Sequence, residues 1–179
     1  MDNILVLDIE TQNSFDDVGG RQNLKDLKVS LVGVYSYLDD KFSAFKEEEL
    51  IELEKMLKDA DLVIGFNIKG FDFPVLKKYF NSINLDRVPT SDILEDVRNN
   101  LGFRVSLNNV AQSTLGVGKS GDGLKAIEYF KMGDFDSLAK YCLDDVRITR
   151  DLYDHGKQNG FICFTSDYSF EKYQIPVQW

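Results

Sequence analysis

The sequence predicts an α/β domain whose sheet contains strands of both directions. An apolar run over residues 4–11 has the length and composition of a buried strand. Two shorter apolar segments follow as a hairpin, and a further buried strand then alternates with amphipathic helices. Three strands in a meander, then helix, strand and helices, are typical of a mixed sheet. In such a sheet the ligand crevice lies near strand ends where the connections diverge.

The first strand, residues 4–11, ends on two carboxylates, Asp8 and Glu10. Residues two apart in a strand point the same way, so both carboxylates share one face while their apolar neighbours face a core. Carboxylates on an inner strand are costly to bury unless they are paired or bound to a metal. The alternative is that the strand emerges into solvent at Asp8 and that Thr11 starts a turn.

The remaining elements follow from apolar periodicity and turn residues. The polar, glycine-containing stretch 12–30 predicts a long loop at the mouth of the acidic strand, and long loops are often functional. The expected strands are 31–37, 42–45 and 62–67, with a turn over 67–72; the expected helices are 47–60, 73–80, 90–100 after a short extended piece, 107–115, 124–132 and 134–156. Residues 116–123 predict a glycine-rich loop, and 160–179 a closing strand or hairpin.

Composition indicates a single domain over residues 1–179. No apolar run reaches the roughly 18 residues of a membrane helix, and no secretion signal precedes the first strand, so we expect a cytoplasmic protein without membrane contact. Cys142 and Cys163 match no metal spacing and are expected to be reduced thiols. The net charge of -9 disfavours a broad, non-specific nucleic-acid surface, although bound divalent cations would reverse the local field.

The long helix over 134–156 carries a buried acid. One stripe of this helix, at helical spacing, reads Leu138, Cys142, Asp145, Thr149 and Leu152. Asp145 interrupts this apolar stripe, with Tyr141 one turn before it. Asp144 lies on a polar stripe beside Lys140 and Arg147, which predicts an ordinary solvated acid.

A third polar feature follows the strand at 62–67. Asn67 opens the turn, and Asp72 directly precedes a helix with Pro74 in its first turn. Taken alone, Asp72 is best interpreted as a helix N-cap. The loop nevertheless leaves a buried strand at the edge that carries Asp8 and Glu10, so a shared site is the competing interpretation.

Together these segments resemble the DEDD superfamily of 3′–5′ exonucleases, which have a ribonuclease H-like fold. Asp8-Ile9-Glu10 looks like the first exonuclease motif, Asn67 through Asp72 like the second, and Tyr141 through Asp145 like the third. The Tyr-x-x-x-Asp form places the chain in the tyrosine branch, since the only histidine, His155, lies too far along the helix. The resemblance implies a mixed five-stranded sheet flanked by helices, with an antiparallel meander of three strands and further parallel strands.

The resemblance also implies two-metal phosphodiester hydrolysis with two Mg²⁺ or Mn²⁺ ions. Hard cations prefer oxygen ligands, and no cysteine and histidine cluster in the sequence indicates zinc. By resemblance Asp8, Glu10 and Asp145 hold one ion, and Asp8 with Asp72 the other. Tyr141 positions the attacking water. Further expected contacts to nucleic acid come from Thr11 and the loop after it, Phe66, Asn67 and, at a phosphate, Lys119.

Other functions remain open at this stage. Gly118-Lys119-Ser120 lacks the first glycine of a phosphate loop, because position 113 is serine. An aspartate-nucleophile phosphatase also ends its first strand on Leu-Asp-x-x-Thr, but leaves Tyr141 and Asp145 unexplained. An inactive nucleic-acid-binding module is the non-enzymatic alternative. The substrate is DNA or RNA, as a single strand or a 3′ end, and a helicase or polymerase is a plausible partner.

Overall fold

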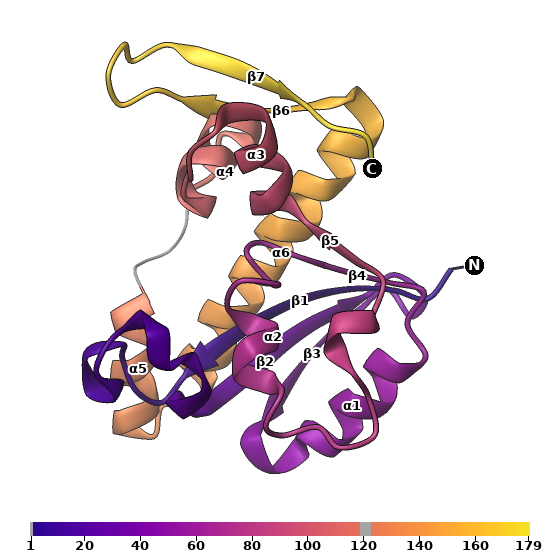
Figure 1. Ribbon diagram of the computed structural model, residues 1–179, viewed down its shortest axis with the longest axis vertical. Helices are drawn as coiled ribbons and strands as arrows, with labels where there is room; N and C mark the ends of the chain where they lie inside the picture. Colours follow the sequence, from indigo (N-terminus) through magenta and orange to yellow (C-terminus); the bar gives the residue numbers. More distant parts are fainter. Residues whose placement is uncertain (1, 119–122) are drawn as a thin grey trace.

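The computed structural model describes residues 2–118 and 123–179 (Figure 1). Within these residues a five-stranded sheet has the order β3-β2-β1-β4-β5. The strands of this sheet are β1 (Ile4–Thr11), β2 (Val29–Ser36), β3 (Lys41–Lys46), β4 (Leu62–Gly65) and β5 (Thr90–Asp92). The pairs β1–β2 and β2–β3 are antiparallel, whereas β1–β4 and β4–β5 are parallel. The predicted mixed sheet with an antiparallel meander is therefore confirmed.

Helices and a second, smaller sheet complete the described chain. The α-helices are α1 (Leu50–Lys58), α2 (Asp72–Leu76), α3 (Ile93–Leu101), α4 (Leu107–Leu115), α5 (Gly123–Met132) and α6 (Phe135–Asn159). Short 3₁₀ turns are η1 (Asp16–Val18), η2 (Arg21–Asp26), η3 (Glu47–Glu49) and η4 (Leu85–Arg87). Strands β6 (Phe161–Thr165) and β7 (Lys172–Pro176) form an antiparallel hairpin that Figure 1 shows at the far end of α6 from α5. None of the described helices is long and apolar enough to cross a membrane.

Strand β1 is covered on both faces, as its alternating pattern predicts. Leu5, Leu7 and Ile9 join a core that includes residues of α1 and α2. Val6, on the opposite face, packs in a second cluster with residues of α4 and α6. Asp8 and Glu10 continue the face of Val6, because side chains two apart in a strand share a side. The fold therefore directs both carboxylates toward the layer that contains α6.

Helix α6 lies unusually close to the sheet at Gly33. This glycine pairs with Asp8 across the β1–β2 ladder. A Cβ atom at Gly33 would lie 2.9 Å from both Cys142 Sγ and Val146 Cγ2 on α6. The missing side chain thus lets α6 approach the strand that carries Asp8, and this approach fixes where the inward residues of α6 lie relative to β1.

The structure corrects several element boundaries. Part of the predicted loop 12–30 forms η1 and η2, and β2 begins at Val29. The helix expected from residue 90 begins instead after β5, because the Asp92 side chain accepts hydrogen bonds from the N–H groups of Leu94 and Glu95 and so caps α3. Helix α6 continues to Asn159, where Gly160 adopts a left-handed conformation and ends it.

Candidate metal centre

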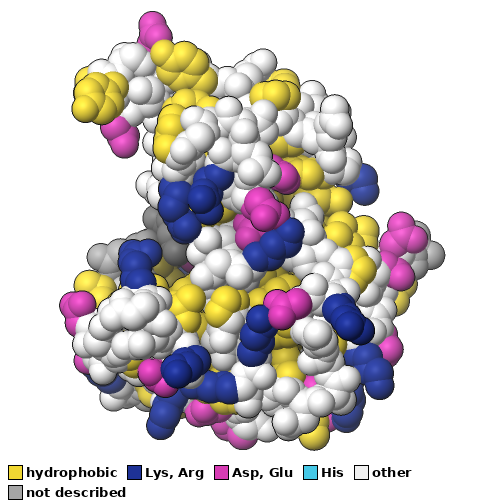
Figure 2. All heavy atoms as spheres, in the orientation of Figure 1, with side chains coloured by type: hydrophobic (Ala, Val, Ile, Leu, Met, Phe, Trp, Pro, Cys, Tyr) yellow, Lys and Arg dark blue, Asp and Glu magenta, His cyan; other side chains and the backbone are white. Residues whose placement is uncertain are grey.

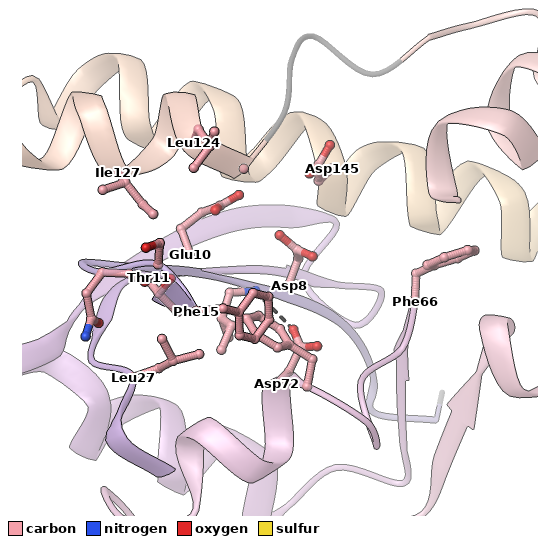
Figure 3. Close-up of a pocket in the computed structure, with 15 residues that line it drawn as sticks. Asp8, Glu10, Thr11, Phe15, Leu27, Phe66, Asp72, Leu124, Ile127 and Asp145 are labelled. Atoms are coloured by element: carbon pink, nitrogen blue, oxygen red, sulfur yellow. Dashed lines mark hydrogen bonds between the residues drawn. The ribbon is translucent and has the colours of Figure 1, made fainter. Parts of the chain in front are cut away.

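Four carboxylates from three elements line one pocket of about 330 Å³. Asp8 and Glu10 come from β1, Asp72 from the start of α2, and Asp145 from α6. Figure 3 shows the Asp8 carboxylate between Asp72 on one side and Asp145 on the other. Residues 8 and 145 are far apart in the sequence, so the fold itself gathers these acids. Each of the three motifs therefore contributes at least one carboxylate to this pocket.

Asp8 and Glu10 point to the same side of β1. A carboxylate oxygen of each and the Cys142 sulfur all lie within 4.8 Å of one another. Two like charges at that separation repel by about 3.5 kcal/mol at an effective dielectric constant of 20. Glu10 is only 8% exposed, so bulk water screens it weakly. A divalent cation beside both carboxylates would replace this repulsion by attraction.

Asp72 does not cap a helix, which contradicts the N-cap interpretation. It is the first residue of α2, and the residue at the cap position, Phe71, makes no side-chain cap. The Asp72 Oδ1 atom instead accepts a hydrogen bond from the Ile9 N–H of β1 at 3.1 Å (Figure 3). Asp72 is 3% exposed. The hydrogen bond ties the second motif directly to the acidic strand.

Asp145 is buried at 1% exposure in the apolar stripe of α6, as the helical spacing predicts. Its stripe neighbours Leu138, Cys142 and Thr149 are buried as well. Asp144, one residue earlier, is partly exposed and forms an ion pair with Arg147 at 2.9 Å. The two adjacent acids therefore have opposite environments, and only Asp145 lines the pocket formed by the described residues.

The thiol of Cys142 lies at the base of the acidic cluster. Its sulfur is 3.6 Å from the backbone oxygen of Asp8 and 4.0 Å from Asp8 Oδ2. Burial, together with the charges of Asp8, Glu10 and Asp145, raises the pKa of Cys142 well above its ordinary value. The thiol is therefore neutral at physiological pH and donates a weak hydrogen bond.

The donor set fits Mg²⁺ or Mn²⁺. Carboxylate oxygen atoms crowd one pocket, and hard divalent cations prefer oxygen ligands. A structural zinc site would need several thiolate or imidazole ligands, and among the described residues only Cys142 lies beside this cluster. Asp8, Glu10, Asp72 and Asp145 are the residues that could hold hard divalent cations here.

Apolar side chains form much of the remaining pocket wall. Phe15 and Phe71 meet edge to face with ring centroids 5.8 Å apart, and Arg21 covers Phe15 at 4.7 Å. Leu27, Leu124 and Ile127 also line this side. Figure 3 shows Phe66 at the other side of Asp8, so the acids lie between two apolar surfaces. Such walls suit the flat face of a base or sugar beside a charged phosphate.

The predicted contact residues are distributed unevenly. Thr11 and Phe66 line the pocket, and the Thr11 hydroxyl donates to the Asn13 backbone oxygen at 2.8 Å. Asn67 and Tyr141 are not among the described residues that line it. Asn67 has a left-handed backbone with φ of 69° and forms the β4–α2 turn. Tyr141 is 4% exposed and lines a different pocket, beside Asp144. Lys119 and Ser120 lie outside the described residues.

Sequence reasoning missed Asp92. This residue is 5% exposed, and its carboxylate accepts hydrogen bonds from the N–H groups of Asn67 at 2.8 Å and Lys69 at 3.0 Å. It also caps α3. Asp92 therefore fixes the turn that leads from β4 to Asp72. The sequence does carry a signal for this role. Asp92 directly precedes an amphipathic helix and is followed three residues later by Glu95, which is the pattern of a helix N-cap.

The chain was compared with protein families, with solved structures and with curated proteins. A family model described as the RNase_H superfamily matches residues 5–156. The family B DNA polymerase of the hyperthermophilic archaeon Pyrobaculum calidifontis is similar in structure, with a TM-score of 0.64 and 21% identity over 87% of this chain and 24% of that chain. RNase D of Trypanosoma brucei is similar with a TM-score of 0.60 and 18% identity over 86% of this chain and 57% of that chain.

At these identities the two solved structures establish the fold, and this chain spans only part of either protein's length. No curated protein matches the sequence. The family match covers β1, β4, α2 and most of α6, the elements that carry all four pocket carboxylates.

Proposed function

Since the chain belongs to the RNase H superfamily, we propose that it is a divalent-metal-dependent 3′–5′ exonuclease that hydrolyses phosphodiester bonds of DNA or RNA. The observation that carries the proposal is the convergence of Asp8, Glu10, Asp72 and Asp145 in one pocket. An inactive binding module has no need to gather four acids, because they repel a phosphate backbone. The superfamily match leaves the aspartate-nucleophile phosphatase without support.

The carboxylates serve as cation ligands in this proposal. Asp8, Glu10 and Asp145 would hold one Mg²⁺ or Mn²⁺ ion, and Asp8 with Asp72 the second. Two such ions, when bound, lower the barrier to attack of water on the phosphodiester and stabilise the leaving oxygen. Asp72 and Asp145 are 3% and 1% exposed, so the packed residues around them hold their carboxylate oxygens in place. Such preorganisation is what electrostatic catalysis requires.

The apolar walls would hold the terminal nucleotide. Phe66 on one side and Phe15, in the loop after Thr11, on the other would contact the flat faces of base and sugar. Asn67 acts through its turn, which sets the position of Phe66. We assign Tyr141 the positioning of the attacking water, supported by its place one helical turn before Asp145 on α6. Lys119 is proposed to meet a substrate phosphate.

Hydrolysis of 5′-labelled oligonucleotides tests the proposal. Single-stranded DNA and RNA are incubated with the protein in Mg²⁺, Mn²⁺ or EDTA, and products are resolved at single-nucleotide resolution. We expect a metal-dependent ladder that shortens from the 3′ end, and the faster substrate identifies the class of nucleic acid. A strand blocked by a 3′-phosphorothioate linkage serves as the control for polarity.

Three results would contradict the proposal. Internal fragments without a ladder would indicate an endonuclease, and release of phosphate from a nucleoside monophosphate would indicate a phosphatase. Binding without cleavage by folded, metal-loaded protein would indicate an inactive nucleic-acid-binding module.

A further inference from the structure

The turn between β6 and β7, residues 166–171, presents aromatic rings to solvent; we call it the aromatic turn. Tyr168 is 98% exposed and Phe170 is 83% exposed. Figure 1 shows the turn projecting to the same side of α6 as α5, which lines the metal pocket. Figure 2 shows hydrophobic side chains at this tip and a hollow between it and the α5 side of the molecule, with Lys and Arg side chains around it.

Phe170 occupies a backbone conformation that disfavours it. Its φ is 56°, in the left-handed region where glycine or asparagine is expected. Because its ring is largely exposed, burial does not compensate for this strain. A glycine would make the same turn at lower cost. The strain and the exposed ring therefore point to a role for Phe170 outside folding.

Hydrogen bonds connect the backbone at the base of the aromatic turn to α4 and also cross the turn itself. The Asn109 side chain of α4 pairs with both backbone groups of Thr165, donating to its oxygen at 2.8 Å and accepting from its N–H at 2.9 Å. Within the turn, Ser166 accepts from the Phe170 N–H and donates to the Glu171 oxygen, both at 2.9 Å. Rings on a preorganised turn lose little conformational entropy when a ligand stacks on them.

A pocket of about 410 Å³ adjoins the aromatic turn. Tyr168 lines it from the turn, and Phe103 and Arg104 line it from the α3–α4 connection. Phe103 is 52% exposed and meets the buried Phe164 edge to face at 5.9 Å. Exposed rings beside a guanidinium are the groups that hold a base and its phosphate in single-stranded nucleic acid.

We propose that this pocket and the aromatic turn form a second nucleotide-binding subsite, which holds the single-stranded part of the substrate away from the metal centre. The inference rests on the proposed function. Stacking is the expected source of affinity, because the acidic Asp167 and Glu171 flank the rings and the net charge is -9. Binding by stacking also suits a protein whose net negative charge opposes phosphate binding.

The test compares long and short strands. Affinity for 5′-fluorescein-labelled 16-nucleotide and 4-nucleotide strands, in DNA and RNA form, is measured by anisotropy in EDTA, and KM and kcat are measured in Mg²⁺. We expect Tyr168→Ala and Phe103→Ala each to weaken binding of the 16-mer by about fivefold or more, and to raise its KM without changing kcat. In this proposal the 4-mer engages the metal centre alone, so its affinity and KM should be unaffected.

Phe170→Gly separates binding from folding. Glycine relieves the strain of the left-handed backbone at position 170, so the variant should have a higher melting temperature. It also lacks the exposed ring, so it should bind the 16-mer more weakly. Ile51→Ala on α1, a 64% exposed residue away from the turn, is the matched control and should change neither.

Two failures are distinguishable. If wild-type protein cuts neither the 16-mer nor the 4-mer, in DNA or in RNA form, the proposed function fails. If wild-type protein cuts the 16-mer and the 4-mer, and the three aromatic variants retain full affinity and KM for the 16-mer, the subsite is overturned. The aromatic turn would then be a surface for a protein partner.

Discussion

Aspartates in and next to the pocket differ sharply in environment although they are chemically alike. Asp145 is 1% exposed and lines the pocket with the other three acids, whereas Asp144 pairs with Arg147 at the surface. Asp72 reaches back to the backbone of β1 rather than capping its own helix. In each case the role of a carboxylate follows from what surrounds it, and the fold supplies those surroundings.

Tyr141 offers the first prediction at this scale. Tyr141→Phe should lower kcat by about tenfold or more with little change in KM, because only the hydroxyl is removed from a buried ring. Steady-state kinetics on a labelled single strand measure both constants. A kcat equal to that of wild type would remove Tyr141 from the proposed mechanism, and a lowered melting temperature with unchanged kcat would make its role structural.

Glu54 offers a prediction about acid sensitivity. Hydrogen bonds from the backbone N–H groups of Ser82 and Ile83, that of Ser82 above all, lower the pKa of Glu54 below its ordinary value of 4.5. A lowered pKa means that the folded state favours the ionised form. This stabilisation is present above pH 4.5 and is lost as the pH falls through the folded-state pKa.

Glu54→Gln should therefore be less stable than wild type near neutral pH. This difference in stability should shrink as the pH falls below 4.5, the ordinary pKa of a glutamate. Urea denaturation between about pH 3 and pH 7 measures it, with the exposed Glu48→Gln as a control of unchanged stability. A difference that stays constant across this range would show that ionisation of Glu54 contributes nothing.

At the scale of elements, the close approach of α6 to the sheet determines where Asp145 lies relative to the acids of β1. Gly33→Ala should destabilise the protein by about 1–3 kcal/mol, because the new Cβ would overlap Cys142 and Val146. The same displacement of α6 should lower kcat by moving Asp145 away from β1.

The double variant Gly33→Ala with Val146→Ala isolates this contact. Removing one of the two clashing groups should make the double variant more stable than the sum of the single effects predicts. Strict additivity in chemical denaturation would show that the helix does not press on Gly33.

Most elements could be predicted from the sequence, because their periodicity is local. The alternation of β1 places Asp8 and Glu10 on one face, and the stripe of α6 places Asp145 on a buried face. Asp145 is 1% exposed and Glu10 8%, whereas Asp8 is only partly buried. The extended piece expected before residue 90 forms β5 at Thr90–Asp92. The bounds of β5 and the side-chain contact of Asp72 could not be predicted, because they depend on partners distant in the sequence. The apolar wall at Leu124 and the position of Tyr141 beside a different pocket also arise only from packing of α5 against α6.

For the whole molecule, the concentration of acid in one pocket predicts that metal ions stabilise the fold. Mg²⁺ or Mn²⁺ at about 100 times its dissociation constant should add about 2.7 kcal/mol, which is a rise of about 5–10 °C in melting temperature for a chain of this size. Asp8→Asn should raise the melting temperature in EDTA, since it removes repulsion with Glu10, and should abolish most of the rise with metal. A metal-induced rise that persists in Asp8→Asn would place the cation elsewhere.

The measurement that tests the account most directly compares Asp145→Asn with Asp144→Asn. The two adjacent residues undergo the same chemical change, but only Asp145 lines the pocket. Mg²⁺-dependent shortening of a 5′-labelled single strand is followed for both variants and wild type, with folding checked by circular dichroism. We predict that Asp145→Asn slows hydrolysis by about 100-fold or more while Asp144→Asn remains within about twofold of wild type. Wild-type activity in folded Asp145→Asn would contradict the four-carboxylate site.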